Sequence, residues 1–171
     1  YYAALAASYK LDMLTATLFG TYAGGADDDA DEDSYLPTLS EGWELTPYIG
    51  GARAFSTGLS DGFASDSLGV GNDGLGIWTV GLILDNISFV ENLSHKLIIA
   101  YAEGTSDEDT ELFSEEDNGW EVYFVNKYMI YENLAAINEL GYFKGSSEIL
   151  DDADYDMDAS YFATVGFSYK F

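Results

Sequence analysis

The side chains best suited to metal chemistry are three carboxylates in an acidic stretch between residues 105 and 118. Asp107, Asp109 and Glu111 alternate with other residues, as the carboxylates of a calcium-binding loop do. The glycine and the final bidentate glutamate of such a loop are not in place. The sequence therefore predicts no dedicated metal site, and we interpret this stretch as part of a solvated acidic loop.

Residues that could act in catalysis are also sparse. The chain has no cysteine and a single histidine, His95. A Ser–His hydrolase needs a histidine that acts as general base beside its nucleophile. His95 falls on the outward phase of a predicted strand, where an interfacial role fits better. The glycine pairs 24–25 and 50–51 lack the spacing of a phosphate-binding loop. We predict no enzyme activity, no catalytic residue and no cofactor.

Composition narrows the class of protein. The chain has 171 residues, enough for one domain, and a formal net charge of −25 with only six Lys and Arg. Nucleic acid is disfavoured as a partner because its phosphates need cationic side chains. The aromatic content of 16% argues against disorder. Because no run approaches the roughly 18 apolar residues of a membrane helix, any membrane crossing must use strands.

The clearest strand pattern lies in residues 158–171. From Ala159 to Phe171 every second residue is apolar, and the residues between are mostly small or polar, with Phe162 as the exception. Strict alternation places the two sets on opposite faces of a strand. A long strand with one apolar face and aromatic ends is typical of the wall of a membrane barrel. The alternative is the edge strand of a soluble sandwich, where such a long apolar edge would favour aggregation.

Similar alternation recurs along the chain and predicts an all-β fold, an antiparallel transmembrane β-barrel region spanning residues 1–171. The expected strands are about 1–11, 14–24, 75–85, 94–104, 119–131, 135–147 and 158–171. Short connections near residue 12, at 86–93 and at 132–134 alternate with long acidic ones at 25–74, 105–118 and 148–157. Outer-membrane barrels alternate short periplasmic turns with long external loops in this way.

The number of expected strands is odd, whereas bacterial single-chain barrels normally have an even number. We therefore expect this chain to be the C-terminal part of a longer protein. The alternative is a complete small barrel in which residues 43–49 supply an eighth strand. A crossing there would turn residues 53–74 into a long periplasmic loop and break the alternation of short and long connections.

Aromatic residues at the strand ends test this topology. On the outward phase, the residues nearest the external ends are Tyr1, Tyr22, Trp78, Tyr101, Trp120, Tyr142 and Tyr161. Tyr9, Tyr128, Tyr169 and Phe171 lie at the other rim. Two such aromatic girdles are what a bilayer-spanning barrel requires. Asn126 and Asn138 depart from the outward pattern, either because they lie at a subunit interface or because the register slips there.

The inward phase is mostly small, hydroxylated or charged, which favours a water-filled lumen. The predicted pore-lining residues are Lys10, Thr15, Thr17, Thr79, Lys96, Glu121, Tyr123, Lys127, Glu139, Ser160, Thr164, Ser168 and Lys170. The four lysines share one depth toward the periplasmic end. They form a basic ring at the inner mouth, or they simply mark strand ends near water. Residues 25–74 either fold into the lumen, with Arg53 at a constriction, or cap the barrel outside.

Several motifs in order resemble the bacterial outer-membrane homotrimeric porin family. They are Ala7-Ser8-Tyr9-Lys10-Leu11-Asp12-Met13 with Thr17-Leu18-Phe19-Gly20 and Asp27-Asp28-Asp29; Trp78 to Leu84 with Ile87-Ser88-Phe89-Val90-Glu91; Tyr131-Glu132-Asn133-Leu134-Ala135-Ala136 with Glu139-Leu140-Gly141-Tyr142; and the terminal Phe167-Ser168-Tyr169-Lys170-Phe171. The last resembles the C-terminal signal that outer-membrane proteins present to the assembly machinery. The resemblance implies a trimer of roughly sixteen-stranded barrels that pass small hydrophilic solutes.

The predicted function is therefore a passive diffusion channel in the bacterial outer membrane. Most of the acidic residues lie in the three long connections, and an acidic mouth gives a mild preference for cations. These acids could equally form a solvated surface that faces lipopolysaccharide. Expected partners are membrane lipid, lipopolysaccharide, further copies of the chain and the assembly machinery. The alternative function is a small closed barrel with a structural or adhesive role and no channel.

Overall fold

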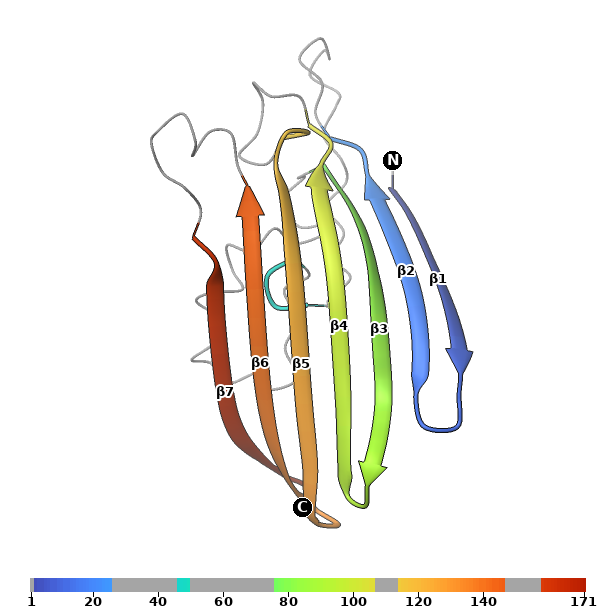
Figure 1. Cartoon of the computed structure of the whole chain (residues 1–171), viewed down its shortest axis with the longest axis vertical. Coiled ribbons are helices and arrows are strands. Elements are labelled where there is room, and N and C mark those ends of the chain that lie inside the picture. Colours follow the sequence, from blue (N-terminus) through green and yellow to red (C-terminus); the bar gives the residue numbers. More distant parts are fainter. Residues whose placement is uncertain (1, 26–45, 50–75, 107–113, 147–157) are drawn as a thin grey trace.

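The computed structural model describes residues 2–25, 46–49, 76–106, 114–146 and 158–171 (Figure 1). It contains one sheet of seven antiparallel strands: β1 (Tyr2–Lys10), β2 (Thr15–Ala23), β3 (Ile77–Val90), β4 (Leu93–Gly104), β5 (Asn118–Tyr131), β6 (Leu134–Ser146) and β7 (Ser160–Tyr169). Each strand pairs with the next in the chain. The predicted all-β antiparallel fold is confirmed, and the sheet is open. The described residues contain no helix long and apolar enough to cross a membrane.

Three short turns lie together at one edge of the sheet, which we call the lower edge (Figure 1). In the first turn the Leu11 amide donates to the Leu14 carbonyl at 2.8 Å. In the second, Asn92 has a φ of 63° and its carbonyl accepts from the Met129 amide at 2.8 Å. Asparagine tolerates this left-handed conformation. The strand ends that the long connections join lie at the opposite, upper edge. The short connections are therefore at one edge of the sheet, and the long ones begin and end at the other.

The third strand differs from the prediction. It was expected to end at Asp85 before a connection over 86–93, but β3 continues to Val90. Asn86 has a φ of 56°, and the register with β4 shifts between Leu84 and Ile87 and again before Val90. Such a bulge inserts an unpaired residue and breaks the alternation of side chains between faces. The periodicity therefore failed to reveal this part of the strand.

The two faces of the sheet have different surroundings. On the covered face, Ile77, Ile98 and Tyr123 are buried, and residues 46–49 pack against it with Ile49 inside the core. Figure 1 shows this short segment behind β5 and β6 at mid-height. These four residues form bends, so they supply no strand, and residues 43–45 of the predicted eighth strand lie outside the described residues. The opposite, bare face carries the residues in phase with Trp120.

On the covered face, two phenylalanine rings lie over glycines of the neighbouring strand. The Phe162 ring lies against Gly141, its partner on β6, and the Phe19 ring lies against Gly81, its partner on β3. A cross-strand aromatic ring covers the backbone that a glycine leaves exposed. Phe162, the exception in the alternation of the last strand, therefore fills space on the covered face that Gly141 leaves empty.

Candidate functional site

The upper part of the covered face contains a fully buried carboxylate, Glu121 of β5. It accepts hydrogen bonds from the backbone amides of Tyr48 and Ile49 at 2.9 and 2.7 Å. A buried carboxylate is costly unless hydrogen bonds replace its water. Because both of its oxygens accept amides from one short segment, Glu121 fixes residues 46–49 to the sheet.

Aromatic packing holds the same segment. The Tyr48 ring stacks on Phe143 of β6 with centroids 5.1 Å apart, and lies 5.9 Å from Phe162 of β7. Its neighbour Thr46 is 1% exposed. The segment is therefore anchored by charge-assisted hydrogen bonds to β5 and by ring contacts to β6 and β7.

A second buried carboxylate links three strands. Glu139 of β6 accepts hydrogen bonds from the Tyr123 hydroxyl on β5 and from the Thr164 hydroxyl on β7, the latter at 2.6 Å. Farther along the same face, the Thr21 and Thr79 hydroxyls lie 2.5 Å apart between β2 and β3. The polar residues that the sequence predicts on the inward phase therefore form hydrogen bonds between neighbouring strands on the covered face.

The predicted pore-lining residues divide into three groups by exposure. Thr79, Glu121, Tyr123 and Glu139 lie on the covered face but are buried. Thr15, Thr17, Lys96, Ser160, Thr164 and Ser168 are half-buried, and Lys10, Lys127 and Lys170 are exposed. The buried group contributes to the interior and cannot contact bulk solvent, which the sequence pattern alone did not reveal. The exposed lysines are the chemically available part of the set.

The lysines lie toward the lower edge of the covered face. Lys127 and Lys170 are brought together around a small cavity of about 60 Å³ that Ser168 and Glu132 also line. Lys96 lies on β4, and Lys10 ends β1 at the other side of the sheet. All four side chains have the same phase when the register is followed through the regularly paired parts of the strands. The lower part of this face is therefore a polar surface that carries four ammonium groups.

On the bare face, aromatic rings form a row near the upper edge. Tyr101 lies 5.3 Å from Trp78 and 4.8 Å from Trp120, and Tyr142 lies 5.1 Å from Tyr161, all between ring centroids. Tyr22 extends the row to β2, since it pairs with Trp78. Tyr1 lies outside the described residues.

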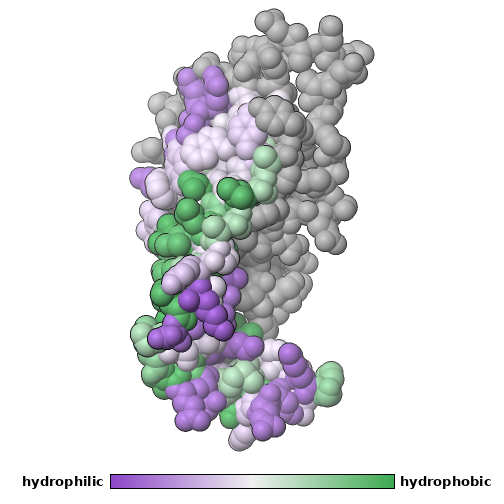
Figure 2. Space-filling view, turned by 90° about the vertical axis from the view of Figure 1, so that its right-hand side faces the viewer, coloured by the Kyte–Doolittle hydropathy of each residue, from purple (hydrophilic) through white to green (hydrophobic). Residues whose placement is uncertain are grey.

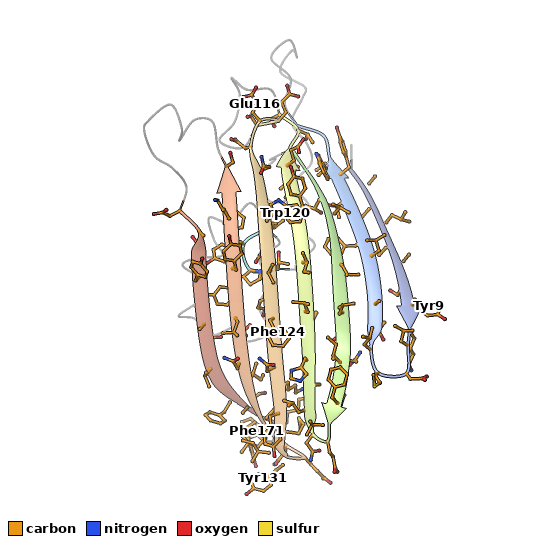
Figure 3. The ribbon with its side chains drawn as sticks, viewed as in Figure 1. Tyr9, Glu116, Trp120, Phe124, Tyr131 and Phe171 are labelled. Atoms are coloured by element: carbon orange, nitrogen blue, oxygen red, sulfur yellow. The ribbon has the colours of Figure 1, made fainter. Side chains whose placement is uncertain are left out.

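A second group of aromatic residues lies toward the lower edge. Tyr9, Tyr128, Tyr169 and Phe171 are exposed there, and the last two are 5.5 Å apart. Figure 3 shows Trp120 high on β5, and Tyr131 and Phe171 at the lower edge. The bare face thus carries aromatic residues toward both ends of its strands.

Between these aromatic groups the bare face is apolar. Leu5 is 77% exposed, Val165 is 74% exposed and Leu140 is 44% exposed. Figure 2 shows the apolar residues as a green band along one side of the sheet, with pale and purple residues above and below. An exposed apolar surface of this extent marks a site of contact with a membrane or another protein.

A chain of polar side chains crosses the lower part of the bare face. His95 Nδ1 lies 2.6 Å from Asn126 Oδ1, Asn126 Nδ2 donates to Asn138 Oδ1 at 3.1 Å, and Asn138 Nδ2 donates to the Thr164 carbonyl at 2.9 Å. The three residues are direct cross-strand partners in a continuous register. The suggested register slip at the asparagines is therefore wrong. The pairing of His95 on β4 with Asn126 on β5 was not predicted from the sequence.

The upper edge carries exposed acids and one structural acid. Glu115 and Glu116 are exposed, and Figure 3 shows Glu116 at the top of the sheet. Asp117 is buried and accepts the Ser114 amide at 2.8 Å, so it shapes its turn. The predicted carboxylates Asp107, Asp109 and Glu111, and Arg53, lie outside the described residues. Within the described part of the chain, no group of three or more acidic or histidine side chains could hold a metal ion.

Comparison of the chain with models of known protein families, with curated proteins and with solved structures finds no match.

Proposed function

We propose that this chain forms part of the wall of an outer-membrane β-barrel of the homotrimeric porin type, and that the pore passes ions and small hydrophilic solutes. The observation that carries the proposal is the bare face, an exposed apolar band between two groups of aromatic residues. In water such a surface is unfavourable, whereas in a bilayer the hydrocarbon core covers the band and the aromatic rings lie at the two interfaces.

The described sheet has two open edges, which a sheet that spans a membrane cannot leave unpaired. Among the described strands, β1 and β7 each pair on one side only. Every backbone group inside a bilayer must be hydrogen bonded, so a sheet that spans it has to close. The proposal therefore includes further strands that pair with β1 and β7. The lower strand ends step downward from β1 to β5 in Figure 1, as the tilt and stagger of a barrel wall require. Trimer formation and a barrel of roughly sixteen strands come from the family resemblance.

In this proposal the covered face lines the lumen. Its lower part exposes lysine and hydroxyl side chains to water, as a diffusion pore needs. The described segment 46–49 of the first long connection packs on this face and narrows the lumen from within. This supports the inward-folded interpretation of residues 25–74. Acidic residues at the upper edge give the mild preference for cations.

A second candidate function is favoured by the burial of the upper part of the covered face. Glu121, Tyr123 and Phe143 are almost fully buried. An interior filled by side chains is typical of small barrels without a channel. Such a protein would be a structural or adhesive component of the outer membrane, with the acidic upper edge as its exposed surface.

Ion conduction separates the two candidates. The full-length parent protein would be purified from membranes and added to a planar bilayer under a KCl gradient. The proposal predicts current steps in groups of three and a reversal potential that favours potassium. Protein that inserts, as shown by protection of its strands from protease, but passes no current would contradict the channel and favour the structural barrel.

A further inference from the structure

Two lysines from different strands line the small cavity at the lower edge of the covered face. Met129, Ala135 and Ser168 form one cross-strand row in this cavity, since Ala135 pairs with both of the others. Lys127 precedes Met129 by two residues and Lys170 follows Ser168 by two. Because neighbouring strands are antiparallel, the two lysines approach the row from opposite sides.

The backbone at both lysines is held by the sheet. Lys127 pairs with Ser94 on one side and with Ile137 on the other. Lys170 follows the last residue of β7, and its amide donates to the Asn133 carbonyl at 2.9 Å, which extends the pairing beyond the strand. The two side chains therefore reach the cavity from fixed positions.

The charges around the cavity leave an excess of positive charge. Both lysines are exposed, and neither makes an ion pair with a described residue. Glu132 is the only acid among the lining residues, so two lysines against one glutamate give a net charge of +1 there. Glu139, on the same face of β6, is fully buried and accepts the Tyr123 and Thr164 hydroxyls. Like charges that share a cavity repel each other, and an anion between them would relieve the repulsion.

We infer that this cavity binds a small doubly charged oxyanion, the class to which inorganic phosphate and sulfate belong. The two ammonium groups supply the opposite charge, and the Ser168 hydroxyl is a further donor in the same cavity. The volume of about 60 Å³ gives room for a small ion. A drug-sized ligand needs a pocket of roughly 300 Å³ or more.

This site goes beyond the proposed function. A ring of lysines raises the local concentration of every anion, whereas a site at two of them saturates and favours an ion with two charges. Lys10 and Lys96 share the phase of the other two but do not line the cavity. Lys10 is exposed, as Lys127 and Lys170 are, so it separates the two kinds of attraction.

The test is acetylation of the refolded full-length protein in micelles of a neutral detergent, followed at each lysine by mass spectrometry. Rates are measured in phosphate and, separately, in sulfate, each against sodium chloride of the same ionic strength. We expect the oxyanion to slow the acetylation of Lys127 and Lys170 several-fold and in a saturable way, and to leave Lys10 unchanged. The lower of the two half-saturating concentrations identifies the better ligand.

Variants test whether the two lysines share one bound ion. In Lys127→Gln, the phosphate concentration that half-protects Lys170 should rise several-fold. Lys10→Gln is the matched control and should leave this concentration unchanged. Glu132→Gln removes the opposing carboxylate and should lower it. The shift in gel mobility between heated and unheated samples verifies that each variant is folded.

Equal protection of Lys10, Lys127 and Lys170, or no protection beyond that in chloride, would overturn the site. Unchanged protection of Lys170 in Lys127→Gln would also overturn it. Because acetylation requires the folded sheet but no ion conduction, its result is separate from the test of the proposed function. Protein that conducts without this protection would keep the pore and lose the site, and protection without conduction would do the reverse.

Discussion

Glu121 shows how one buried side chain can fix a segment that is distant in sequence. Its carboxylate accepts the amides of Tyr48 and Ile49, which precede it by more than 70 residues. Each donor would be left without this partner if the carboxylate were removed, and an unpaired buried amide costs about 1–3 kcal/mol. Because charged acceptors form stronger hydrogen bonds than neutral ones, the ionised form of Glu121 holds the segment best.

Glu121→Ala should therefore loosen the segment 46–49 and lower the free energy of unfolding by about 2 kcal/mol or more. Glu121→Gln, which keeps one acceptor oxygen, should have a smaller effect. The measurement is urea unfolding in lipid vesicles, combined with limited proteolysis of the chain near residue 48. Glu116→Gln is the control, because that carboxylate is exposed at the upper edge. Equal stability of Glu121→Ala and Glu116→Gln would contradict the role assigned to Glu121.

At the scale of the strands, contacts between aromatic rings and glycines help to set the register. The Phe162 ring occupies the place of a side chain at Gly141, so that any larger residue there must displace the ring. Gly20 of β2 differs, since a Cβ there would meet its nearest atom, the Thr79 carbonyl oxygen, at 3.6 Å, an ordinary contact distance. The two glycines therefore form a matched pair for mutation.

Gly141→Ala should lower the free energy of unfolding by about 1–3 kcal/mol, because the methyl group and the Phe162 ring compete for the same space. Gly20→Ala should change it by much less. In the double variant Gly141→Ala with Phe162→Ala, the cost should be smaller than the sum of the single changes. The free energy of unfolding in urea is measured for the unchanged protein, for Gly141→Ala, Gly20→Ala and Phe162→Ala, and for the double variant. Additive single costs would show that the ring and the glycine do not interact.

The sequence predicted the faces of the strands well because alternation depends only on local pattern. It predicted the upper aromatic row on the bare face and the common phase of the four lysines. It failed where non-local contacts decide the structure. The bulge in β3 interrupts the alternation, and the burial of Glu121 depends on a segment more than 70 residues away. The bonding of His95 to Asn126 depends on the pairing of β4 with β5, which single-strand patterns do not contain.

At the scale of the whole molecule, charge is unevenly distributed. The chain carries a formal net charge of −25, yet four of its six Lys and Arg lie toward the lower edge of one face. In the proposed pore these ammonium groups would face the water at the inner mouth. They would attract anions there and reduce the preference for cations that the acidic upper edge creates.

Replacing Lys10, Lys96, Lys127 and Lys170 together by Gln should increase the preference for potassium over chloride. Screening by salt shortens the reach of these charges, so the shift in reversal potential should be larger at 0.1 M than at 1 M KCl. Lys144→Gln is the control, because Lys144 lies on the bare face. An unchanged reversal potential in the fourfold variant would show that these lysines do not face the ion path.

In the proposed function the bare face contacts lipid and the covered face contacts water. The chain has no cysteine, so single cysteines can be introduced along β7 at 163, 164, 165, 167 and 168 and spin-labelled after refolding into vesicles. Accessibility to oxygen, which dissolves in lipid, and to a water-soluble nickel complex is then measured by electron paramagnetic resonance. We expect high oxygen accessibility at 163, 165 and 167, and lower oxygen accessibility at 164 and 168. Uniformly high accessibility to the nickel complex, without this alternation, would contradict the membrane-spanning sheet.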